Sequence, residues 1–144
     1  MTRQRMRASV AALGTACAMS VPAADARFRL GLSQDEQAAF LSEMRVMLGS
    51  VQGIVQGIAD SDRAAIARFA SASGKRMARA TPPSIAAKLP PAFGAIGEPT
   101  HLMFDETAVR AGTDDMDMLA RQLAHALRQC MACHAAITVR GDPR

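Results

Sequence analysis

Apolar positions in this 144-residue chain follow a helical spacing through most of its length. In the first such stretch they recur at alternating intervals of four and three residues, at Phe40, Met44, Met47, Val51, Ile54 and Ile58. This spacing places them on one face of an α-helix that packs against other helices. Ser33 and Glu36 carry the signature of a capping box, so the helix is expected to begin there. Asp60-Ser61-Asp62 interrupts the pattern and should end it.

Three glycines recur every four residues within this first helix, at Gly49, Gly53 and Gly57. A glycine inside a helix costs up to about 1 kcal/mol relative to alanine. A face without side chains also lets another helix or a flat group approach closely. We therefore expect a close contact along this face.

Two more helical segments are expected in the middle of the chain. One extends from Asp62 to Ala80 and is ended by Pro82-Pro83, because proline cannot continue a helix. After a connector with a short turn at 84–88, the other extends from Pro91 to Ala111. Pro99 lies inside it and is expected to kink or restart it.

The last helix should begin at Thr113-Asp114-Asp115, where acidic side chains suit the positive end of the helix dipole. Its apolar stripe is Met116, Ala120, Leu123, Leu127, Cys130, His134 and Ile137. A cysteine and a histidine are thus expected on its buried face. Four helical segments, without a strand pattern or an internal repeat, predict an all-α protein, an antiparallel four-helix bundle.

The N-terminus has the pattern of a secretory signal peptide. Three arginines and no acid precede an apolar run from Ala8 to Val21, and small residues continue to Ala26. Cleavage after Ala23 or after Ala26 fits equally well. The run is shorter than the about 20 residues that span a bilayer, so a membrane anchor is the weaker alternative. We expect residues 1–26 to be removed, and residues 27–144 to form one periplasmic domain without stable membrane insertion.

The composition and net charge of the chain limit the kinds of molecule that we expect it to bind. Removal of residues 1–26 takes three arginines and one aspartate from 17 basic and 13 acidic side chains, so the net charge falls from +4 to +2. The chain has no Trp or Tyr and no basic patch interleaved with aromatic residues, which argues against nucleic acid as a partner. Only two of the three cysteines, Cys130 and Cys133, remain after cleavage. They lie too close together in the sequence for a disulfide between them to stabilise the fold. We therefore expect them to have a chemical role rather than a structural one.

Cys130-Met131-Ala132-Cys133-His134 is a C-x-x-C-H sequence, the attachment motif for c-type haem. Two thiols on one helical turn can form thioethers with the two vinyl groups along one edge of a porphyrin. The histidine beside them brings an imidazole to the iron. A zinc site would need a second pair of ligands, and a thioredoxin-like dithiol would need a βαβ context. We therefore predict one covalent haem c, with His134 as the proximal iron ligand.

A C-x-x-C-H motif on the last helix of an exported helical bundle resembles the cytochrome c′ family, the class II c-type cytochromes. The resemblance covers residues 33–140, and its specific part is the motif with the helix that carries it. It implies a periplasmic monohaem protein, often a homodimer, that either transfers electrons or binds small gases. Thr138 departs from the family, which typically has a basic residue four positions after the haem histidine. This departure weakens the expectation of a typical gas-binding pocket.

The resemblance also suggests a second iron ligand. The family's low-spin cytochrome c-556 branch places a methionine on the distal face, and that position falls on Met44. At 1.5 Å per residue, Met44 also lies nearer than Met47 to the level of His134 if the last helix ends near Arg140. Methionine commonly fills core gaps as well. Met47, His101 or no ligand at all remain alternatives.

With His134 and Met44 as axial ligands, the chain is expected to transfer electrons to redox partner proteins that its sequence does not identify. The alternative is a five-coordinate protein that binds nitric oxide or carbon monoxide. A peroxidase-like enzyme would need an open iron and a distal acid–base pair. Glu43 and Arg45 flank Met44 but are expected to point away from the stripe. We therefore predict no catalytic residue and no enzymatic activity.

Overall fold

The computed structural model describes residues 25–139. Apart from Asp25 and Ala26, the predicted signal peptide lies outside the described residues. The described part is all-α, as predicted, with one very short strand pair. Its elements are β1 (Phe28–Arg29), α1 (Gln34–Ala59), α2 (Arg63–Ala72), α3 (Lys75–Ala80), α4 (Pro83–Ala86), α5 (Pro91–Arg110), α6 (Met116–Ala136) and β2 (Ile137–Thr138). No helix within residues 25–139 has the length and apolar character needed to span a membrane.

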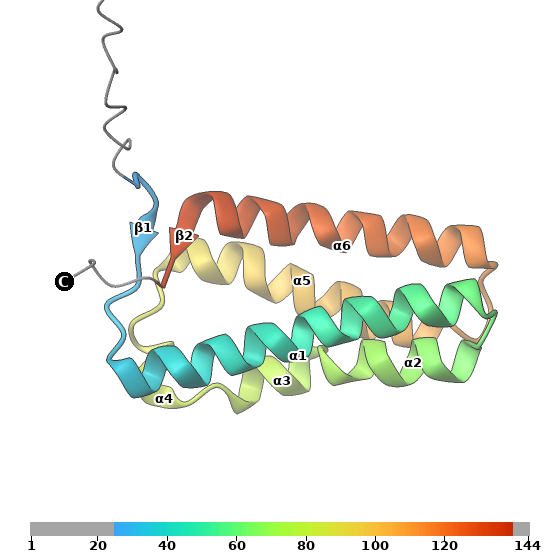
Figure 1. Cartoon of the computed structure of the whole chain (residues 1–144), viewed down its shortest axis with the longest axis horizontal. Helices are drawn as coiled ribbons and strands as arrows, with labels where there is room; N and C mark the ends of the chain where they lie inside the picture. Colours follow the sequence, from blue (N-terminus) through green and yellow to red (C-terminus); the bar gives the residue numbers. More distant parts are fainter. Residues whose placement is uncertain (1–24, 140–144) are drawn as a thin grey trace, which may run out of the picture.

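The long helices lie side by side along the long axis of the molecule (Figure 1). The α1 helix packs along α2, α2 along α5, and α5 along α6. Contact between α1 and α6 is much less extensive. The turn of α4 lies in the connector between α3 and α5. This uneven packing leaves room between α1 and α6.

The strand pair corrects the expectation of a chain without strands. Phe28 pairs in parallel with Ile137, and Arg29 pairs with Thr138. Leu30 then donates its backbone N–H to the Thr138 carbonyl at 3.0 Å. The chain after α6 therefore finds partners for its buried polar groups in the segment before α1. Two residues per strand are too few to produce a recognisable alternation in the sequence.

The start of α1 matches the predicted capping box. Ser33 Oγ accepts a hydrogen bond from the backbone N–H of Glu36 at 3.3 Å, and the Ser33 N–H donates to Glu36 Oε2 at 2.8 Å. Lys88 donates to the same Glu36 oxygen. The Lys88 bond and the Ser33 N–H lower the pKa of Glu36 from 4.5 to about 2. The first turn of α1 is thus tied to the connector that precedes α5.

The glycine face of α1 meets α2 closely at two of its three positions. A Cβ on Gly53 would lie 2.2 Å from Cγ of Phe69, and one on Gly57 would lie 2.7 Å from Cγ1 of Ile66. A Cβ on Gly49 would have nothing within 4 Å. The predicted close approach is therefore confirmed for Gly53 and Gly57, and the neighbour is a helix.

The predicted continuous helix from Asp62 to Ala80 is wrong, because the helix is interrupted at Ser73-Gly74. Side chains from α5 occupy the interruption. His101 Nδ1 lies 2.7 Å from the Ser73 carbonyl, and the Lys75 N–H donates to Asp105 Oδ2 at 3.1 Å. A Cβ on Gly74 would collide with Asp105. The α5 helix thereby provides partners for the backbone groups that the break leaves free.

The two final helices keep their predicted bounds to within a few residues. The α5 helix continues through Pro99 without restarting. In α6 the buried side chains are Leu119, Leu123 and Ala126. Ala120 is exposed and Leu127 is 38% exposed, so the predicted stripe was partly wrong. The reason is packing: α6 contacts α5 more extensively than α1, which turns its buried face toward α5.

The core has two parts. The larger cluster contains Ile54, Ile66, Ala70, Phe104, Ala111, Leu119 and Leu123, with Met47 and Val51 packed against it. The smaller cluster contains Leu30, Phe40, Ile85 and Ile137, with Met44, Phe93 and Cys133 packed against it.

Candidate functional site

An apolar cavity of about 350 Å³ lies among α1, α5 and α6 and borders both core clusters. Its volume falls within the range of small-molecule pockets. From α1 it is lined by Leu41, Met44, Arg45, Met47, Leu48 and Val51; from α5 by Phe93, Ile96, Gly97, Thr100, His101 and Phe104; and from α6 by Leu127, Gln129, Cys130, Cys133 and His134. The whole predicted attachment set, and every predicted candidate for the distal ligand, therefore faces one space.

The α6 helix presents the C-x-x-C-H motif to this cavity. Cys130 and Cys133 are half-buried, and both are free thiols. His134 is exposed, which corrects its predicted place on the buried face. The physical reason is that α6 ends at Ala136, so His134 lies in the last turn, where the neighbouring helices no longer cover it. Arg27 donates to the His134 carbonyl at 3.2 Å and holds this turn against the segment before α1.

The environment of the two thiols favours their protonated form. Burial raises the pKa of Cys130, and burial together with the neighbouring Cys130 raises the pKa of Cys133. Zinc sites use thiolates, usually with four protein ligands. Among residues 25–139, no group of three or more His, Cys, Asp or Glu side chains is placed to hold a metal ion. The donor set therefore does not resemble a structural zinc site.

Three predicted alternatives for the second iron ligand line the same cavity. Met44 packs against the core cluster that also holds Cys133, whereas Met47 packs against the other cluster. His101 lines the cavity too, but its Nδ1 is engaged by the Ser73 carbonyl. A carbonyl oxygen can only accept, so Nδ1 carries the hydrogen and Nε2 of the neutral ring is left as an acceptor. Shared packing with Cys133 distinguishes Met44 from Met47.

A second cavity of about 390 Å³ adjoins the first, and Met44, Phe93, Gly97 and His101 line both. It is more polar, because Glu43, Lys75, Arg79 and Glu98 also line it. Burial raises the pKa of Glu43, although its hydrogen bond from Thr81 and the nearby His101 act in the opposite direction.

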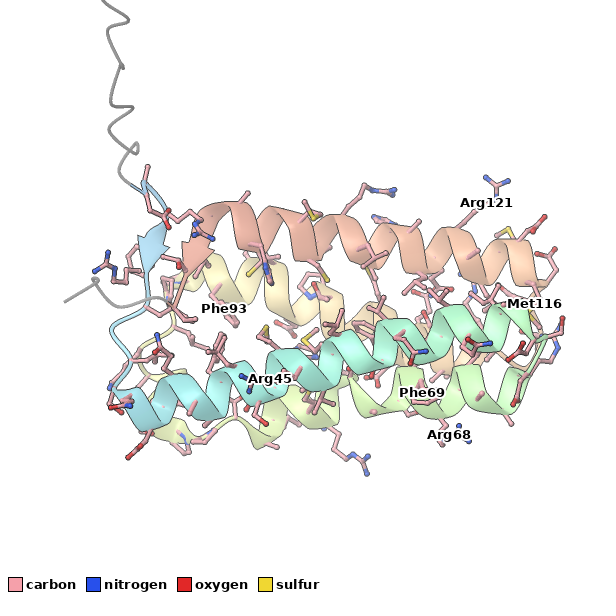
Figure 2. All side chains as sticks on the ribbon, viewed as in Figure 1. Arg45, Arg68, Phe69, Phe93, Met116 and Arg121 are labelled. Carbon is pink, nitrogen blue, oxygen red and sulfur yellow. The ribbon has the colours of Figure 1, made fainter. Side chains whose placement is uncertain are left out.

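The prediction that Glu43 and Arg45 point away from the stripe of α1 is wrong for Arg45, whereas Glu43 is absent from the lining of the first cavity. Glu43 lines the second cavity, and Arg45 lines the first. In Figure 2, Arg45 lies on α1 beside the space between α1 and α6. Helix geometry explains the difference, since residues adjacent to a stripe position are rotated by only about 100° and a long side chain can reach back to the edge of the stripe.

Reasoning from the sequence missed the contribution of α5. Phe93, Ile96, Gly97, Thr100 and Phe104 form one wall of the cavity. Their spacings of three and four residues mark one helix face, but nothing in that pattern says whether the face meets another helix or a ligand.

The arrangement brings two thiols, the His134 imidazole and the Met44 thioether to one apolar space. Scans of the chain against protein-family models, curated proteins and solved structures found no match in any of the three.

Proposed function

We infer that this protein is a c-type cytochrome that carries one covalent haem and transfers electrons. The observation that carries the proposal is the cavity, in which Cys130, Cys133 and His134 from α6 face Met44 from α1 across an apolar space. A six-coordinate haem iron needs one protein ligand on each face of the porphyrin, and side chains from two facing helices can supply them. Cys130 and Cys133 would hold the porphyrin through thioethers, and His134 and Met44 would be its axial ligands.

The architecture supports the same proposal. We propose that the long helices, which lie side by side (Figure 1), make up an antiparallel four-helix bundle in which α2 and α3 count as one interrupted helix. The motif lies on the last of them. This is the arrangement that the resemblance to the cytochrome c′ family implies. Helical bundles of this kind commonly build cofactor sites between facing helices.

The haem would supply one-electron exchange between ferric and ferrous iron. A methionine ligand favours the ferrous state and raises the reduction potential. The apolar walls formed by Phe93, Ile96 and Phe104 would exclude water from the porphyrin faces and act in the same direction. With both axial positions filled, no site is left for a substrate, so we propose electron transfer and no enzymatic activity.

A second candidate function is binding of a small gas, such as nitric oxide or carbon monoxide. The observation that favours it is the second cavity, which shares Met44 and His101 with the first and would give a small molecule a path to the distal side. In that case Met44 would be only part of the pocket wall.

Export to the periplasm is proposed from the N-terminal sequence. The paired strand β1 begins at Phe28, directly after the predicted cleavage points. Cleavage after Ala23 or Ala26 would therefore leave the contact between β1 and β2 intact.

Retention of haem after denaturation tests the proposal. Protein produced with a haem-attachment system and treated with acidified acetone should keep its haem colour, because thioether bonds survive where axial ligation does not. Replacing Cys130 and Cys133 together by alanine should abolish the colour. Met131→Ala is the matched control, since Met131 lies inside the motif but is 72% exposed. Haem that washes out of the wild-type protein would refute the assignment.

A further inference from the structure

The mouth of the apolar cavity can be located from side chains that both line it and are exposed. Four do so: Arg45 and Leu48 from α1, and Leu127 and His134 from α6. All four belong to the two helices that contact each other least among the neighbouring long helices. The mouth therefore opens between α1 and α6.

Exposed apolar side chains surround this mouth. Leu48 is 67% exposed and Leu127 is 38% exposed. Met131, one turn after Leu127 on the same face of α6, is 72% exposed. Side chains of this kind gathered at one opening, rather than scattered singly, are typical of an interaction surface. We call the surface formed by Arg45, Leu48, Leu127, Arg128 and Met131 the mouth face.

The parts of α1 and α6 beside the mouth carry basic side chains and no acidic ones. From residue 44 to 59 in α1, and from residue 118 to 136 in α6, there is no aspartate or glutamate. The same stretches contain Arg45, Arg121 and Arg128. Of these, Arg121 points away from α1 in Figure 2 and lies outside the mouth. All three arginines are exposed. Arg45 and Arg128 therefore provide positive charge beside the mouth, whereas the carboxylates of α1 and α6 lie nearer the N-termini of these helices, at Asp35, Glu36, Glu43 and Asp117.

We propose that the mouth face is the docking surface for a redox partner protein with an acidic face. The inference rests on the proposed function, because it takes the haem edge to lie in the cavity behind this mouth. Opposite charge steers the encounter, and the apolar centre provides the contact that keeps the two proteins together. Docking at the mouth would bring the partner's cofactor as close to the haem as the fold allows.

Stopped-flow electron transfer between the haem-loaded protein and a reduced flavodoxin, an acidic redox protein, tests this proposal. The second-order rate should fall as salt rises, since the Debye length shrinks to about 10 Å at 0.1 M. Arg45→Glu with Arg128→Glu should lower the rate at low salt by about tenfold or more. At high salt the wild-type protein and this double variant should react with the flavodoxin at similar rates. Leu48→Ser with Met131→Ser should lower the rate at every salt concentration.

The matched control is a double variant with the same change in net charge away from the mouth. Arg68→Glu with Arg76→Glu meets that requirement, because both residues are exposed, lie on α2 and α3, and line neither cavity. This control should change the rate by less than about twofold. An equal loss in the control would mean that only net charge matters, and the proposal would be wrong.

Spectra and midpoint potentials separate this inference from the proposed function. If no variant and no wild-type protein holds covalent haem, the proposed function fails first. If haem is bound but the rate is independent of salt, only the docking proposal fails. A shift in midpoint potential for Arg45→Glu, with an unchanged salt dependence, would assign that arginine to the haem itself and would also refute docking at this face.

Discussion

At the scale of single residues, Met44 occupies the most informative position in the molecule. It lines both cavities and packs in the same apolar cluster as Cys133. Met47, one turn further along α1, lines the first cavity but belongs to the other cluster. The two methionines therefore form a natural pair for testing which thioether binds the iron.

Met44→Ala should convert the ferric haem from low spin to high spin and open it to carbon monoxide. It should also lower the midpoint potential, because a thioether ligand favours ferrous iron. Absorption spectra with and without carbon monoxide, together with a redox titration, measure all three changes. Met47→Leu should leave the spectrum unchanged and cost less than about 1.5 kcal/mol of stability, as a swap that conserves volume. A wild-type protein that is already high spin and takes up carbon monoxide would make gas binding the better proposal.

At the scale of elements, α1 and α2 pack closely because glycines replace larger side chains where the helices meet. Phe69 of α2 lies against Gly53, with Arg68 4.9 Å above the centre of its ring. Ser50 and Ser73 share a buried hydrogen bond of 2.8 Å at the same interface. The helices could not keep this separation with a methyl group at position 53.

Gly53→Ala should destabilise the protein by at least about 1–3 kcal/mol, because its Cβ would overlap the Phe69 ring. Gly49→Ala is the matched control on the same helix. Nothing lies within 4 Å of its added carbon, so it should stabilise by up to about 1 kcal/mol through helix propensity alone. Urea denaturation of both variants measures the difference. Equal effects in the two would show that the helices are further apart than described.

The bond between Glu36 of α1 and Lys88 of the connector should make the free energy of unfolding depend on pH. Glu36 has its pKa lowered to about 2 by Lys88 and the Ser33 N–H, against 4.5 for the free side chain. Its contribution is therefore complete above about pH 4.5 and is lost as the pH falls through about 2. Glu36→Gln should reduce the slope of unfolding free energy against pH in this window. An unchanged slope would mean that the carboxylate is as free in the folded protein as in the unfolded chain.

At the scale of the whole molecule, the cavity divides the apolar core into two clusters that the haem would join. The α1 and α6 helices contact each other much less than the other neighbouring long helices do, and the cavity is lined by both of them. The fold and the cofactor should therefore depend on each other.

Protein lacking haem, made as Cys130→Ala with Cys133→Ala, should melt at least about 10 °C below the haem-loaded protein. Loss of the apolar contacts with the haem should lower the free energy of unfolding by several kcal/mol. Each kcal/mol lowers the melting temperature by roughly 4 °C in a domain of this size. Circular dichroism measures the melting temperature, and binding of an apolar dye reports the open cavity. Equal melting temperatures would show that the cavity is not the place where haem is held.

Features that depend on residues close together in the chain could be predicted from the sequence. The capping box needs only Ser33 and Glu36, three residues apart, and the attachment motif needs only one turn of α6. Helix periodicity likewise arises within a few turns, so the all-α class and most helix ends could be predicted. The thiols and the imidazole of the candidate site were identified for the same reason.

Tertiary structure alone decided what depends on residues far apart in the chain. The interruption at Ser73-Gly74 exists because His101 and Asp105, 28 and 30 residues away from their partners, supply hydrogen bonds to it. The buried face of α6 and the α5 wall of the cavity were likewise set by which helices pack together. A periodic pattern shows that a face is apolar. Only the packed helices show what that face contacts, because burial is a property of neighbours that the local sequence does not contain.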